Sequence, residues 1–92
     1  MDNKMYLNYQ EKKISREEES NIPDFTSHDE ARAYFKDRFG NNFQIISSKE
    51  FEDRKIYFYD LILDKERYLQ SRDLLSYQSI EIDDNGNIHI IH

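Results

Sequence analysis

A single carboxylate, Asp60, interrupts an otherwise apolar run of residues from Ile56 to Leu63. A carboxylic acid buried in surroundings of low dielectric has a raised pKa, and such acids are common in catalytic and ligand-binding sites. The run therefore contains one candidate acid for a small enzyme or a small-molecule pocket. The alternative is structural, because Asp60 could lie near a strand end or pair with an arginine such as Arg38 or Arg67.

The three residues directly before this carboxylate, Tyr57, Phe58 and Tyr59, are all aromatic. Aromatic rings on a sheet can stack nucleic-acid bases, but such platforms need flanking cations, and only Arg54 and Lys55 are close in the sequence. Core packing and protein interfaces use aromatic residues more often. We therefore expect Tyr57 and Tyr59 to belong to the core, to a protein-binding surface, or to a pocket that they share with the carboxylate.

A second acidic group, Glu81, Asp83 and Asp84, lies in a segment whose alternating acidic and amide residues are followed by glycine. This pattern is similar to an EF-hand calcium loop, in which the twelfth residue is a bidentate glutamate. Counted from Glu81, that position is His92, and both flanks have strand patterns. Zinc is not expected either, because the chain has no cysteine and because His89 and His92 would face opposite sides of a strand. We predict no metal site.

The sequence contains no nucleophile elbow, phosphate-binding glycine loop or dinucleotide fingerprint, and its two glycines leave little material for such loops. We predict no cofactor. Whether the chain is an enzyme stays open at this point, and the missing motifs favour a protein that is not one.

The helix that should support these groups is predicted over residues 28–39. Ser27 and Glu30 have the spacing of a capping box, and Gly40 supplies the left-handed residue that commonly ends a helix. Four apolar residues share one face of this helix: Ala31, Tyr34, Phe35 and Phe39. His28, in the first turn, is expected to be exposed to solvent.

Strands are predicted at residues 5–9, 43–47 and 55–63 from their alternating or continuous apolar residues. Asp64 is placed to cap a second helix over residues 65–75. That helix would pack through four apolar residues: Tyr68, Leu69, Leu74 and Leu75.

The C-terminal segment is predicted to be a β-hairpin with a three-residue loop, Asp84-Asn85-Gly86, in which Gly86 is left-handed. A two-residue Asn-Gly loop would place isoleucines opposite polar residues. The three-residue loop instead pairs isoleucines with each other on one buried face, Ile82 with Ile88 and Ile80 with Ile90. It also places Glu81 opposite His89, which is a favourable cross-strand pair.

These elements follow the order β-α-β-β-α-β-β within one domain over residues 1–92. We predict an α+β fold with one antiparallel or mixed sheet and one or two helices packed on a face. Residues 10–24 have no periodicity, the run from Ser15 to Ser20 is polar on all sides, and Pro23 closes the segment. We expect this segment to be a mobile polar loop or at most one turn of helix.

The 92 residues carry a formal net charge of −6, and the cations are dispersed among acids instead of forming a basic stripe. This distribution argues against nucleic acid and anionic membranes as partners. The chain has no cysteine, and its first residues lack the apolar run of a signal peptide. We therefore expect a cytoplasmic protein.

Two stretches of the chain resemble other sequences. Residues 76–82, continuing through the loop at 84–86 to residues 88–92, resemble the C-terminal end of small uncharacterised proteins of low-GC Gram-positive bacteria such as Bacillus. Residues 21–25, with the helix that follows, are similar to the middle of the same proteins. The resemblance implies no particular activity and assigns no functional residue.

These observations favour a cytoplasmic, non-enzymatic protein-interaction module with an acidic, tyrosine-rich surface. Its partner would be another protein or a second copy of the chain. The candidate binding residues are Tyr57, Tyr59, Asp60, Glu81, Asp83 and Asp84. The alternative is a small enzyme or small-molecule-binding protein whose pocket, between the first helix and the sheet, surrounds Asp60 and Tyr57 or Tyr59.

Overall fold

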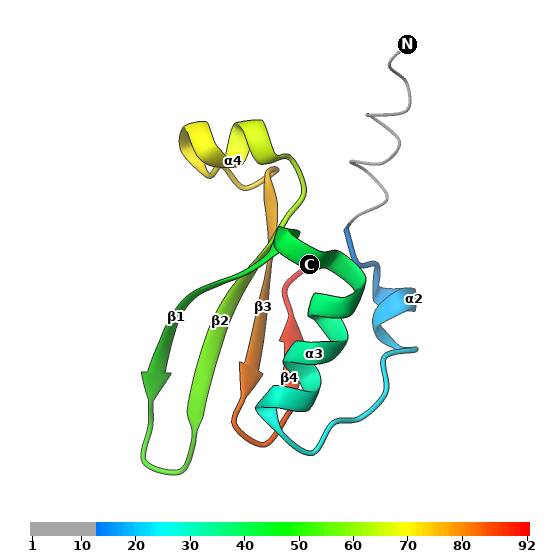
Figure 1. Ribbon diagram of the computed structural model, residues 1–92, viewed down its shortest axis with the longest axis vertical. Helices are drawn as coiled ribbons and strands as arrows, with labels where there is room; N and C mark the ends of the chain where they lie inside the picture. The colour runs from blue at the N-terminus through cyan, green and yellow to red at the C-terminus, as the bar shows by residue number, and fades with distance from the viewer. Residues whose placement is uncertain (1–12) are drawn as a thin grey trace.

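Four antiparallel strands form one sheet in which every strand pairs with its neighbour in the sequence (Figure 1). The computed structural model describes residues 13–92, and the strand predicted over residues 5–9 lies outside this range. In order across the sheet, the strands are β1 (Phe43–Glu50), β2 (Lys55–Ile62), β3 (Tyr77–Asp83) and β4 (Ile88–Ile90). The helical elements are α2 (Arg16–Glu19), α3 (His28–Phe39), the 3-10 turn η1 (Gly40–Asn42) and α4 (Lys65–Ser71). The predicted α+β class is confirmed.

Helix α3 packs across one face of the sheet and has the predicted bounds (Figure 1). The Ser27 hydroxyl accepts a hydrogen bond from the main-chain N–H of Glu30 at 3.1 Å, which caps the first turn. Gly40 ends the helix with a φ of 57°. Ala31 and Phe35, from the predicted apolar face, are fully buried.

The core lies between α3 and this face of the sheet. Phe35 stacks on Phe43 with ring centroids 5.2 Å apart, and Phe43 stacks on Tyr59 at 4.3 Å. Leu61 and the isoleucines of β3 and β4 surround these rings. Because alternate residues of a strand face opposite sides, Tyr59 faces α3 while its neighbour Asp60 faces the other side of the sheet.

The β3–β4 hairpin has the predicted register. Three cross-strand pairs define it: Ile82 with Ile88, Ile80 with Ile90, and Glu81 with His89. Gly86 is left-handed, with a φ of 88°, and its main chain packs directly against residues 25–27. A Cβ added at Gly86 would lie 2.8 Å from both the main-chain N and O of Ser27. Glycine is therefore needed here both for its backbone conformation and for its lack of a side chain.

The β1–β2 hairpin is longer than predicted, because β1 continues to Glu50 instead of ending at residue 47. Its turn is closed by a hydrogen bond from Phe51 N–H to Arg54 O at 2.8 Å. A bulge between Ile45 and Ser47 shifts the register of β1 against β2. Beyond its first residue β1 is exposed, so its pairing and not its burial defines it as a strand.

The segment before α3 is attached to the core at Ile14. This side chain is 5 % exposed, and its N–H and C=O bond the side-chain amide of Gln78 at 2.8 and 3.0 Å. Ser15 and Glu18 form the capping box of α2, so the predicted single turn of helix is present. A single isoleucine among polar residues has no periodicity, so no local pattern in the sequence predicts this attachment.

Helix α4 is shorter than predicted and packs differently. Asp64 caps it as expected, accepting a hydrogen bond from Arg67 N–H at 3.3 Å. The helix ends at Ser71 because Arg72 takes a left-handed conformation with a φ of 49°. Of the predicted apolar residues only Tyr68 is half-buried, and three leucines are 65–82 % exposed: Leu69, Leu74 and Leu75. The described helices, those within residues 13–92, include none long and apolar enough to cross a bilayer.

Candidate functional site

The candidate residues chosen from the sequence lie in three places and do not form one site. Tyr57 and Tyr59 face α3 from β2. Asp60 lies on the opposite face of the same strand, where residues of α4 and its C-terminal end cover it. The remaining three lie toward the far end of β3 and in the turn that follows: Glu81, Asp83 and Asp84.

Asp60 is buried, and both of its carboxylate oxygens are hydrogen-bonded. Its side chain is 3 % exposed. Arg72 donates from Nε to Oδ2 at 2.8 Å and from Nη2 to Oδ1 at 3.1 Å, and the Tyr68 hydroxyl donates to Oδ2 at 2.8 Å. The guanidinium also lies over the Tyr77 ring, 4.4 Å from its centroid. The expectation of an arginine partner is therefore confirmed, but the predicted partners, Arg38 and Arg67, are wrong.

The surroundings of Asp60 make it a structural anion. Its hydrogen bonds raise the pKa of the Arg72 guanidinium, and burial together with the bond to Asp60 raises the pKa of Tyr68. The ion pair holds the end of α4 against the sheet. Because Tyr57 and Tyr59 face the opposite side of β2, the predicted pocket that they would share with Asp60 is not formed.

Tyr59 belongs to a buried cluster that contains a histidine. Its hydroxyl lies 2.7 Å from Nε2 of His28, whose ring stacks on Tyr57 with centroids 3.8 Å apart. The other ring nitrogen of His28 lies 3.5 Å from a carboxylate oxygen of Asp29. Burial raises the pKa of Tyr59, and the positive charge of Arg32 acts in the opposite direction.

The expectation that His28 is exposed is wrong, because its side chain is only 14 % exposed. The sequence contained the signal: His28 precedes Ala31 by three residues and Phe35 by seven, which places it on the buried face of the helix. The part of the chain that the structure describes also shows no tyrosine-rich surface, and Tyr6 and Tyr9 lie outside it. All five tyrosines within residues 13–92 are buried or half-buried.

The acids of the β3–β4 hairpin have different surroundings. Asp83 is 7 % exposed and accepts hydrogen bonds from the main-chain N–H groups of Asn85 and Asn87, both at 2.9 Å, and from the Asn87 side chain at 3.0 Å. Burial alone would raise the pKa of Asp83, but these bonds outweigh it and lower the pKa. Asp84 is exposed and joins the two hairpins, since it accepts from Lys55 N–H at 3.2 Å and donates to Lys55 O at 3.0 Å.

Glu81 is partly exposed on the sheet face opposite α3. Its carboxylate lies 3.5 Å from Nδ1 of His89, as the predicted cross-strand pair requires, and its side chain is 33 % exposed. Of the three hairpin acids, Asp83 is therefore committed to the turn, whereas Glu81 and Asp84 present charge to solvent.

The turns of both hairpins and the start of α3 lie at one end of the molecule (Figure 1). Of the cations on the β1–β2 hairpin at this end, Lys49 lies over Phe51 and Lys55 over Tyr57, while Arg54 is 3.9 Å from a neighbouring carboxylate. Six exposed carboxylates gather at this end, which we call the acidic end: Asp29, Glu30, Glu50, Glu52, Asp53 and Asp84. Acids outnumber cations at this end.

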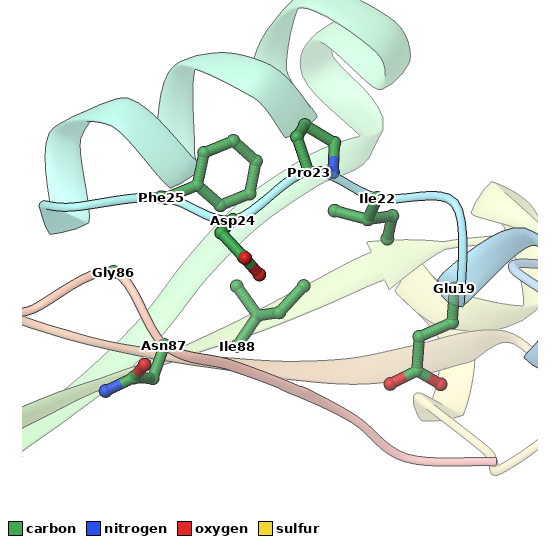
Figure 2. A pocket seen from close by; sticks show the side chains of 8 residues that line it. All are labelled: Glu19, Ile22, Pro23, Asp24, Phe25, Gly86, Asn87 and Ile88. Atoms are coloured by element: carbon green, nitrogen blue, oxygen red, sulfur yellow. The ribbon is translucent and has the colours of Figure 1, made fainter.

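A groove of about 310 Å³ lies between residues 22–25 and the start of β4, and we call it the β4 groove (Figure 2). Its apolar lining comes from Ile22, Pro23, Phe25 and Ile88. Glu19 and Asp24 add carboxylates, and no lysine or arginine of the described chain lines it. Sequence reasoning missed this groove, although the apolar residues around Pro23, after a polar run, were a signal that this segment packs against something.

The described side chains, from residue 13 onward, include no group of three or more histidine, aspartate or glutamate residues that could hold a metal ion. No family model, curated protein or solved structure matches this chain. The acidic end and the β4 groove are the two surface features of the described residues that bear on function.

Proposed function

We propose that this chain is a cytoplasmic, non-enzymatic protein-interaction module that binds a partner with a basic surface. The acidic end carries the proposal, because it presents six exposed carboxylates on the two hairpin turns and the start of α3. Charges of one sign that are presented together accelerate the encounter with an oppositely charged protein and select against other partners.

The backbone that carries these charges is held firmly. The paired bonds between Asp84 and Lys55 couple the two hairpin turns, and Asp83 fixes the second turn from inside. The main chain of Gly86 packs against Ser27 just before α3. A preorganised charged surface loses little conformational entropy on binding, which favours recognition of a complementary protein.

The buried polar groups support the same conclusion. Every buried side-chain nitrogen or oxygen in the described part of the chain has a hydrogen-bond partner. Asp60 is occupied by Arg72 and Tyr68, and Tyr59 by His28, so these groups serve stability. A second copy of the chain is a poor partner for this surface, because two acidic ends repel each other.

The test is affinity capture from a lysate of the native host with three forms of the tagged protein. The first is unchanged, and the second carries Glu50→Gln, Glu52→Gln and Asp53→Asn at the acidic end. The third is the matched control, in which the same charge is removed elsewhere: Glu17→Gln, Asp37→Asn and Glu66→Gln, all at exposed positions.

We expect one protein to be recovered in near-equal amount with the unchanged bait and the control, and to be lost with the acidic-end variant and at high salt. Recovery of the same proteins by all three forms would contradict the proposal. So would recovery of the bait alone.

A further inference from the structure

At Ile88 the outer side of β4 is a strand edge that no other strand within residues 13–92 covers, whereas Ile90, at the end of β4, is only 3 % exposed. Two main-chain hydrogen bonds join β3 to the flanks of β4. They run from Asp83 N–H to Asn87 O and from Ile91 N–H to Ser79 O, both at 3.0 Å. Antiparallel pairs alternate between bonded and non-bonded positions. Ile88 therefore points its N–H and C=O away from β3, and no described strand pairs with that side.

The β4 groove lies beside this edge, since Ile88 contributes to both. Figure 2 shows the Ile88 side chain pointing toward the segment that carries Ile22, Asp24 and Phe25. The groove therefore combines apolar side chains with the outward main-chain N–H and C=O of Ile88. This combination is typical of sites where an extended peptide adds a strand to a sheet.

The charge of the groove defines the side chain that it accepts. Asp24 is exposed and has no hydrogen-bond partner among the described residues, and Glu19 is 2.6 Å from His92 Nε2. Long cationic side chains place an aliphatic stem on apolar surface and a charged head on carboxylates. A lysine or arginine matches both the walls and the rim.

The size of the groove restricts what it can hold. Its volume of about 310 Å³ is at the lower end of the range of about 300–1,000 Å³ for small-molecule pockets. Contact between Gly86 and Ser27 closes it at one end, and the pair of Glu19 with His92 lies at the other. The space therefore suits one long side chain together with the short piece of main chain that carries it.

From this geometry we infer that the β4 groove binds an extended segment of the partner protein, which adds to the outer edge of β4 and inserts a lysine or arginine side chain. The stem of that side chain packs between Phe25 and Ile88, and its head binds Asp24 and Glu19. The inference rests on the proposed function, because it describes one segment of the same partner.

The inference is tested by titrating the ¹⁵N-labelled protein with defined peptides. The first pool contains capped pentapeptides with a central arginine and with valine, isoleucine or threonine at the other positions. The matched pool replaces arginine with citrulline, which has nearly the same shape and no charge. We expect the amide signal of Ile88 to move toward hydrogen-bonded values, and the arginine pool to bind about tenfold more tightly than the citrulline pool.

Strand addition is separated from simple charge attraction by methylating the peptide nitrogens. Alternate amides of an added strand face the edge of the sheet. Two isomeric peptides, each methylated on one of two adjacent amides, should therefore differ: one loses binding and the other keeps it. Equal binding by both isomers would overturn strand addition.

The protein variants locate the charge. Asp24→Asn is expected to weaken binding of the arginine pool about tenfold. Asp37→Asn, which removes an exposed acid from α3 away from the groove, should leave it unchanged. The acidic-end variant with Glu50, Glu52 and Asp53 neutralised should also bind normally.

Two results would overturn the inference, and they have different consequences for the proposed function. Signal shifts confined to the hairpin turns and abolished in the acidic-end variant would place arginine at the acidic end, which leaves the proposed function standing. No shift with either pool at millimolar peptide would exclude the groove, and the capture experiment would then decide the proposed function by itself.

Discussion

The ion pair between Arg72 and Asp60 provides the sharpest test of how the fold is held together. In Arg72→Ala, the Asp60 carboxylate, which is 3 % exposed, keeps Tyr68 as its one remaining side-chain donor among the contacts described. Removing one partner of a fully buried pair costs about 3–5 kcal/mol. The Arg72 side chain is 47 % exposed, so water can reach the vacated position. We therefore expect Arg72→Ala to lower the free energy of unfolding by a smaller amount, about 2–3 kcal/mol.

The backbone at Arg72 adds a second, separable effect. Its φ of 49° is left-handed, and a residue other than glycine adopts this conformation at a cost of about 1 kcal/mol. Arg72→Gly loses the same ion pair as Arg72→Ala but avoids this cost. We therefore expect the glycine variant to be about 1 kcal/mol more stable than the alanine variant.

Both effects are measured by urea unfolding followed by circular dichroism, with Arg38→Ala as the control, because Arg38 is exposed and has no part in this pair. In an Asp60→Asn background, Arg72→Ala should cost clearly less, since a neutral amide does not need the cation. An equal cost in both backgrounds would refute the ion-pair argument. A glycine variant no more stable than the alanine variant would refute the backbone argument.

Three further predictions concern a buried acid, a buried phenol and the two glycines. The folded pKa of Asp83 is lowered from its ordinary 3.8, so it adds stability above pH 3.8 that is lost as the pH falls through the folded pKa. Asp83→Asn should thus lower the free energy of unfolding by about 2 kcal/mol at pH 7 and by progressively less below pH 3.8. Urea unfolding at a series of pH values measures this loss, and a loss that does not change with pH would contradict the prediction. The folded pKa of Tyr59 is raised above 10.0, so its contribution is present below pH 10.0 and is lost as the pH rises toward the folded pKa. Tyr59→Phe should lose stability less steeply above pH 10, and identical alkaline unfolding curves would argue against this assignment. Gly86→Ala should lower the melting temperature much more than Gly40→Ala, because a Cβ at Gly86 meets main-chain atoms at 2.8 Å whereas nothing lies within 4 Å of one at Gly40; equal shifts would show that backbone conformation alone determines the cost.

The elements that the sequence predicts correctly are those defined by neighbouring residues. The cap at Ser27 and the stop at Gly40 lie close to the helix that they bound, and α3 has the predicted length. The register of the β3–β4 hairpin follows from the spacing of the isoleucines around Gly86, which the chain determines within a dozen residues. The sequence also shows that this turn is acidic, although of its two acids only Asp84 is exposed.

The errors concern contacts between distant residues. Asp60 pairs with Arg72 and not with Arg38 or Arg67, because the left-handed residue that ends α4 turns its side chain back onto the sheet. No local pattern in the sequence marks that conformation. The burial of His28 is different, because its spacing from Ala31 and Phe35 indicates the buried face of α3, and only its partner Tyr59, 31 residues later, depends on how α3 crosses β2.

The attachment of Ile14 to Gln78 joins residues that are 64 positions apart, whereas every strand of the sheet pairs with the next one in the sequence. Closing a longer loop costs more chain entropy, and local pairings form earlier. The sheet can therefore assemble before the N-terminal segment docks, and that segment can detach while the sheet stays folded. Because the same segment continues to the wall formed by Ile22 and Phe25, detachment removes one side of the β4 groove. A ligand in the β4 groove would hold the segment in place and slow amide hydrogen exchange at Ile14. Exchange at Ile14 would therefore report whether the groove, at the other end of the segment, is occupied.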